Sequence, residues 1–171
     1  YNLPVALATK KDGVWEKTSS EEYIAKANAV SRALLRMGIQ KDDKIALITS
    51  NNRTEWNIMD IGILQTGAQN VPIYPTISEE DYEYILNHSG SIYCFVSDDE
   101  VLQKVRMIQA NVPTLKEVYS FNEIPGCKHW SDLLALGEDQ SNQNEVEARK
   151  DSIQTDDLAT IIYTSGTTGR P

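Results

Sequence analysis

The chain has 171 residues, 40% of them apolar and 24% charged, with a formal net charge of −9 at pH 7. A chain of this length and composition can bury the core of one domain. Its negative net charge argues against nucleic-acid partners, which bind basic surfaces. No stretch reaches the roughly 18 apolar residues of a membrane-spanning helix, whereas an anionic small molecule remains compatible with a locally favourable loop.

The first predicted element is a helix that begins near Ser19. Ser19 and Glu22 have the spacing of a capping box, apolar residues then recur at helical intervals, and Gly38 supplies a stop. Residues 44–49 are a short apolar run after a charged turn, which favours a buried strand.

A second helix is expected after that strand. Asn52 and Glu55 predict its cap, and Gly67 predicts its end. The pattern of residues 70–74 then predicts a strand. Pro72 has no N–H to donate to a neighbouring strand, so we expect this strand at an edge or an irregular position of the sheet.

The following segments continue the alternation of helices and strands. Ser78 is a candidate helix cap, and Ser97 with Glu100 indicates the start of a later helix. The expected helices cover 78–88, 97–110 and 130–136, and the expected strands cover 91–96 and 116–121.

Residues 137–154 differ from the rest of the chain because they are polar and have almost no apolar periodicity. We expect a mobile linker or surface loop there. Residues 157–164 then predict a final strand that leads into a Ser/Thr/Gly loop at 164–170.

This order predicts an α/β fold, with a mostly parallel sheet and helices on both faces. Ligands in such sheets gather at the carboxyl ends of the strands. The 164–170 loop follows a predicted strand, so we expect it to lie at that edge.

The composition of this loop suits a phosphate. Thr164, Ser165, Thr167 and Thr168 offer hydroxyl donors, while Gly166 and Gly169 allow backbone N–H groups to turn toward an anion. The spacing is not that of the Gly-x-x-x-x-Gly-Lys-Ser/Thr phosphate loop. A flexible turn with locally satisfied hydroxyls is the alternative.

Residues 163–171, YTSGTTGRP, resemble the signature loop of the adenylate-forming superfamily, which includes acyl-CoA synthetases, peptide-synthetase adenylation domains and luciferases. Residues 38–48, 50–56 and 67–76 are also similar to that superfamily. The segments 12–16 and 71–76 most resemble long-chain fatty acid–CoA ligases. The resemblance implies the N-terminal part of a large AMP-binding domain, here residues 1–171.

The resemblance implies a two-step reaction. A carboxylate attacks the α-phosphate of ATP, and coenzyme A then displaces AMP from the acyl adenylate. The implied substrates are ATP with Mg²⁺, a fatty acid and CoA. The implied ATP phosphate-binding residues are Thr164, Ser165, Gly166, Thr167, Thr168 and Gly169, with Thr164 also the candidate Mg²⁺ contact.

Several expectations concern the chain as a piece of a longer protein. It opens on Tyr1 and stops at Pro171, before the lysine that usually continues the motif, so we expect a truncated fragment. The later motifs of the superfamily are absent, no catalytic set is complete, and we predict that the fragment is inactive. It is expected to dimerise through an exposed sheet surface.

Other interpretations of the function stay open. The chain is alternatively a non-catalytic nucleotide- or anion-binding α/β module, or part of a different acyl- or aryl-CoA ligase or adenylation domain. Neither Cys94 nor Cys127 demands a disulfide, so a cytoplasmic setting is the simpler expectation. Surface or capping roles are expected for His88 and His129. Peripheral membrane contact of the intact parent is also left open.

Overall fold

The computed structural model describes residues 2–11 and 13–164. Its centre is a five-stranded parallel sheet in the order β4-β3-β5-β6-β7. The strands are β3 (Lys44–Ile48), β4 (Gln69–Ile73), β5 (Tyr93–Val96), β6 (Glu117–Ser120) and β7 (Lys128–His129). The predicted α/β fold with a parallel sheet is therefore confirmed.

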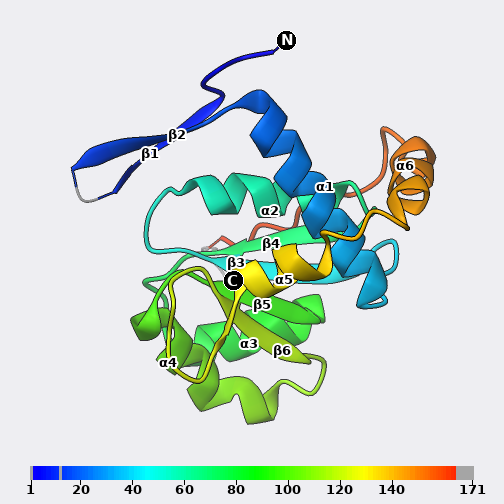
Figure 1. The fold of residues 1–171 in the computed structure, drawn as a ribbon. Coiled ribbons are helices and arrows are strands. Elements are labelled where there is room, and N and C mark those ends of the chain that lie inside the picture. Colours follow the sequence, from blue (N-terminus) through cyan, green and yellow to red (C-terminus); the bar gives the residue numbers. More distant parts are fainter. Residues whose placement is uncertain (1, 12, 165–171) are drawn as a thin grey trace.

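Helices cover both faces of this sheet (Figure 1). One face packs against α1 (Ser20–Arg36), α2 (Thr54–Leu64) and α5 (Trp130–Leu136). The other packs against α3 (Glu79–Ser89) and α4 (Asp99–Ile108), the latter extended by a 3₁₀ turn at Gln109–Asn111. A sixth helix, α6 (Gln143–Ser152), lies beside α1.

Alternation along the central strands divides the core into two layers. On β3, Ile45 and Leu47 pack with the α1 and α2 side, whereas Ala46 and Ile48 pack with the α3 and α4 side. Successive side chains of a strand point to opposite faces, so a strand buried on both faces reads as a continuous apolar run. This explains why the sequence located β3 and β5 correctly.

Two of the predicted helix caps are confirmed, and two are wrong. Ser19 accepts from the Glu22 amide and Ser78 from the Asp81 amide, as expected of serine caps. The cap of α4 is Asp98 rather than Ser97. The cap of α2 is Arg53 rather than Asn52, and its side chain makes no capping bond.

The capping hydrogen bond that Arg53 does not supply to α2 comes from a hairpin at the start of the chain. The strands β1 (Leu7–Lys11) and β2 (Val14–Thr18) form a separate antiparallel pair that extends from the body (Figure 1). The Thr54 amide donates to Thr9 Oγ1 at 3.1 Å, and the hydroxyls of Thr9 and Thr54 are 2.7 Å apart. A side chain distant in sequence thus satisfies one of the orphan donors of α2.

The structure corrects the prediction of a mobile linker or surface loop at 137–154. Its residues 143–152 form α6 rather than a loop, and Val146 of that helix is fully buried. Arg32 of α1 donates to the Gly137 carbonyl at 2.7 Å and to the Gln143 side chain. Tertiary contacts therefore order a stretch whose own apolar pattern is too weak to predict a helix.

The predicted final strand at 157–164 is also corrected. The structure gives this segment a single parallel bridge, between Asn70 of β4 and Thr160, and no strand. β4 is the edge strand of the five-stranded sheet, which fits the edge position expected from Pro72. Among the described residues, no helix is long and apolar enough to cross a membrane.

Candidate functional site

Most of the predicted phosphate loop lies outside the described residues. Thr164 is exposed and is its one described member. The other predicted residues, Ser165, Gly166, Thr167, Thr168 and Gly169, lie outside the described residues. The structure instead shows how the chain approaches the loop.

The first anchor of this approach is Asn70 on β4, which is 1% exposed. The Asn70 amide donates to the Ala159 carbonyl at 3.1 Å, and the Asn70 carbonyl accepts from the Ile161 amide at 3.0 Å. The Thr160 hydroxyl adds a bond to the same carbonyl at 2.9 Å. Three bonds therefore hold residues 159–161 against the edge of the sheet.

The second anchor is a side-chain contact at Tyr163. Its hydroxyl lies 2.8 Å from His88 Nδ1 at the end of α3, and the two rings meet edge to face with centroids 5.7 Å apart. The ring of Tyr84 stacks on the His88 ring, with the two centroids 5.5 Å apart. Burial, with a smaller contribution from Tyr84, raises the pKa of Tyr163, so its phenol keeps its proton at neutral pH.

Polar side chains also meet at the carboxyl ends of β3 and β5. The Ser50 amide donates to Ser97 Oγ at 3.0 Å, and both serine hydroxyls donate to Asp98, at 2.8 and 2.6 Å. Burial opposes ionisation of Asp98, but bonds from Ser97, Ser50 and the backbone outweigh it and lower the pKa. The carboxylate is thus ionised and committed to partners within the fold.

Arg53 joins several strand ends at this edge of the sheet. Its guanidinium donates to the Ser97 carbonyl and to Asn122 Oδ1, each at 3.3 Å, and pairs with Glu55 at 2.9 Å. It also lies over the Phe121 ring, 4.9 Å from the centroid. Sequence reasoning missed Arg53, which lies in the loop between β3 and α2.

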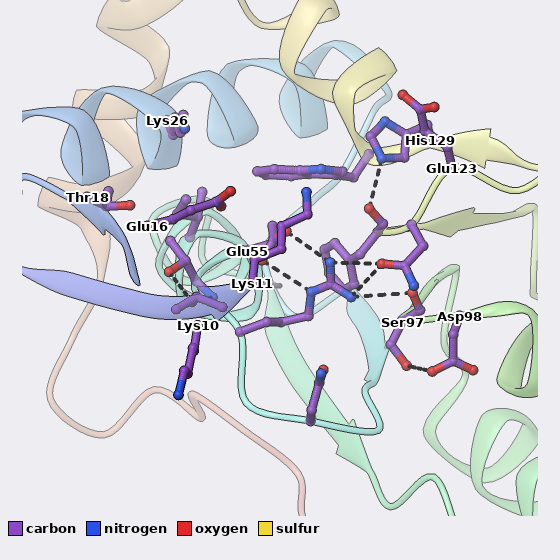
Figure 2. Close-up of a pocket in the computed structure, with 18 of the residues that line it drawn as sticks. Lys10, Lys11, Glu16, Thr18, Lys26, Glu55, Ser97, Asp98, Glu123 and His129 are labelled. Carbon is purple, nitrogen blue, oxygen red and sulfur yellow. Dashed lines mark hydrogen bonds and ion pairs between the residues drawn. The ribbon is translucent and has the colours of Figure 1, made fainter. Parts of the chain in front are cut away.

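A pocket of about 740 Å³ opens between the β1–β2 hairpin and this edge (Figure 2). Thr164 is not among the residues that line it. Its charged lining combines both signs, with Lys10, Lys11, Lys17, Lys26 and Arg53 against Glu16, Glu22, Glu55, Asp98 and Glu123.

The remaining sequence candidates have structural roles. His129 caps α5 in a capping box with Asp132, as expected of a capping histidine. Cys94 is buried and Cys127 half-buried, and both are free thiols. Among the described residues, no group of three or more His, Cys, Asp or Glu side chains is arranged to hold a metal ion.

Comparison with known proteins connects nearly the whole chain to one enzyme family. The family model described as AMP-binding enzyme matches residues 4–171. The long-chain-fatty-acid–CoA ligase FadD15 of Mycobacterium bovis is 36% identical over 161 residues, which cover 94% of this chain and 26% of that protein. The chain therefore spans about a quarter of this relative's length.

Solved structures agree with the fold described above. An anthranilate CoA ligase, AuaEII, in complex with anthranoyl-AMP matches with a TM-score of 0.78 and 26% identity, covering 91% of this chain and 29% of that one. A Mycobacterium tuberculosis fatty acyl CoA synthetase matches with a TM-score of 0.72 and 22% identity, covering 88% and 28%. The second likeness bears on the fold alone.

Proposed function

The chain belongs to the AMP-binding enzyme family, and from that premise we propose that it is part of an ATP-dependent long-chain fatty acid–CoA ligase. The proposed reaction first joins the fatty acid carboxylate to the α-phosphate of ATP, with release of pyrophosphate. The thiol of coenzyme A then displaces AMP. The observation that carries the proposal is the family match across residues 4–171, which includes the whole Ser/Thr/Gly loop.

In this proposal the loop binds the β- and γ-phosphates of ATP. Hydroxyl and backbone N–H donors of residues 164–169 stabilise the charge that develops on the leaving pyrophosphate. Mg²⁺ enters with ATP as part of the substrate. The exposed Thr164 hydroxyl is a hard oxygen donor, which suits Mg²⁺, and it is the proposed protein contact of the ion.

The acid substrate is proposed from the relatives. The 36% identical relative is named as a long-chain-fatty-acid–CoA ligase, which supports a fatty acid. The 26% identical solved structure is named as an anthranilate CoA ligase, which supports an aryl acid as the second candidate. The difference in identity favours the fatty acid.

We also propose that residues 1–171 alone do not catalyse this reaction. The chain spans only 26% of the length of the relative it matches at 36% identity. A two-step transfer must position ATP against the acyl carboxylate and then CoA against the acyl adenylate, and lost positioning groups are costly to the rate. The small-molecule substrates and a cytoplasmic location are proposed for the intact protein.

The direct test is palmitate-dependent exchange of pyrophosphate into ATP by the intact protein that contains this chain. Thr167→Ala is expected to lower the exchange by about 10²-fold, the usual cost of losing a donor at a charge-stabilising site. Gly166→Val keeps its backbone N–H but adds a β-branched side chain, and it is expected to lower the exchange because it restricts the backbone conformations open to the loop. Thr155→Ala, in an exposed turn, is the control and should leave it unchanged. Equal exchange by all these variants would contradict the assigned role of the loop.

A further inference from the structure

We propose that His88 is a positioning residue for the phosphate loop, acting through its contact with Tyr163. Tyr163 directly precedes Thr164, the first residue of the proposed phosphate site. The inference rests on the proposed function, because it concerns how that same site is held. It assigns a positioning role to a residue on α3 that belongs to no motif of the loop.

The geometry of the contact supports this role. The Tyr163 hydroxyl and His88 Nδ1 are 2.8 Å apart, within ordinary hydrogen-bond range. The His88 ring is itself oriented, because Tyr84, one turn earlier on α3, stacks on it with an interplanar angle of 23°. Tyr84 thus helps to present Nδ1 to Tyr163.

The contact between His88 and Tyr163 matters because it lies next to the start of the loop. The bonds to Asn70 fix residues 159–161, and among the described residues no strand pairing follows the bridge at Thr160. Ile161 and Tyr163 pack against the core layer that contains α3, whereas Thr164 is exposed. Tyr163 is therefore the described residue nearest to Thr164 whose side chain is bonded to α3, through His88 at 2.8 Å and also through Ser89.

A hydrogen bond that holds the chain just before the loop is expected to strengthen ligand binding. A loop that binds phosphate must adopt one arrangement, and a fixed starting point lowers the entropic cost of doing so. Binding geometry that is held by supporting contacts outside the site is a general requirement of functional sites. Loss of the tie should weaken MgATP binding more than it weakens the fold, because His88 itself is exposed.

The test uses the intact protein and four variants at the contact. His88→Ala removes the ring, Tyr163→Phe removes the hydroxyl, the double variant removes both, and His88→Asn places an amide where Nδ1 was. The matched control is Tyr23→Phe, which deletes another phenolic hydroxyl, bonded at 3.2 Å to the Asn57 carbonyl and packed on the opposite face of the sheet from α3. The dissociation constant of MgATP is measured by isothermal titration, beside thermal unfolding and the KM for CoA.

His88→Ala and Tyr163→Phe should each raise the MgATP dissociation constant by about three- to tenfold, the range expected for one hydrogen bond. The double variant should bind no worse than the weaker-binding single variant, because both substitutions remove the bond between His88 and Tyr163. His88→Asn should restore most of the affinity. The KM for CoA and the Tyr23→Phe affinity should not change.

Unchanged MgATP affinity in His88→Ala and Tyr163→Phe would overturn the inference, and so would additive losses in the double variant. Failure of the proposed function has a different signature. In that case the unsubstituted protein binds MgATP but shows no carboxylate-dependent pyrophosphate release. If the unsubstituted protein does not bind MgATP at all, both proposals are overturned.

Discussion

The backbone of Gly137 lies directly against Ala29 of α1, so that a Cβ at position 137 would overlap the Ala29 carbonyl oxygen. Gly137 has φ −90° and ψ 0°, a conformation that other residues adopt, so the demand for glycine here is steric. We predict that Gly137→Ala lowers the free energy of unfolding by about 1–3 kcal/mol, the usual cost of overpacking. Urea denaturation of the intact protein measures it.

The control for this substitution is Gly126→Ala. Gly126 has φ +73° and open space around its Cα, so alanine there adds backbone strain without a clash. Its expected cost is about 1 kcal/mol. A smaller loss for Gly137→Ala than for Gly126→Ala would contradict the steric argument.

A second prediction concerns Arg32, which is 7% exposed and holds the segment between α5 and α6. Arg32→Met should lower the free energy of unfolding by about 1.5–3 kcal/mol, because it leaves the Gly137 carbonyl without its charged donor. Arg36→Met, at a more exposed ion pair with Asp139, should cost at most about 1 kcal/mol. Urea midpoints and proteolysis within residues 138–152 give the comparison. Equal losses in the two variants would show that burial of Arg32 adds nothing.

A third prediction is the pH dependence that arises from Glu55. Burial opposes ionisation of Glu55, but its bonds with Arg53 and the backbone prevail and lower the pKa below 4.5. In the unfolded chain this carboxyl takes up a proton at higher pH than in the folded state, so its stabilisation is present above about pH 4.5 and lost below it. Glu55→Gln should therefore reduce the acid sensitivity of the urea midpoint between pH 6 and 3.

The control for the acid prediction is Glu138→Gln, at an exposed position just after α5. It should leave the slope of the urea midpoint with pH as it is in the unsubstituted protein. An unchanged slope in Glu55→Gln would mean that the Arg53–Glu55 pair does not govern stability in this range.

A fourth prediction concerns the outer edge of the sheet in the isolated chain. Leu158 and Ile162 flank the single bridge at Thr160 and are 65% and 61% exposed. Exposed apolar side chains beside a sheet edge favour association. We predict that residues 1–171 alone form dimers or larger species in light scattering, and that Leu158→Lys with Ile162→Lys shifts them toward monomers. The same species distribution in both would exclude this edge as the contact.

The parts of the fold that the sequence predicted are those with strong local signals. The apolar runs of β3 and β5 and the serine caps at Ser19 and Ser78 carry their structure in a few neighbouring residues. Local reasoning failed where distant residues decide. Thr9 supplies the bond that α2 lacks at its own N-terminus, and Arg32 orders the polar segment around Gly137.

The same distinction applies to the site. The composition of residues 164–169 favours a phosphate loop without any tertiary information, and that assignment stays a prediction. Nothing in the sequence indicated that His88 contacts Tyr163 or that Arg53 joins the ends of β5 and β6, because both contacts link segments far apart in the chain. Strand order and helix packing are needed to bring such residues together.

The central claim is that the intact protein activates a long-chain fatty acid with ATP. The most direct measurement is pyrophosphate release by the intact protein with acetate, palmitate or an aryl acid, with residues 1–171 alone as the comparison. We predict release with palmitate, little with acetate or the aryl acid, and none from residues 1–171 alone. Release with the aryl acid but not with palmitate, or release with none of the three acids, would contradict the claim.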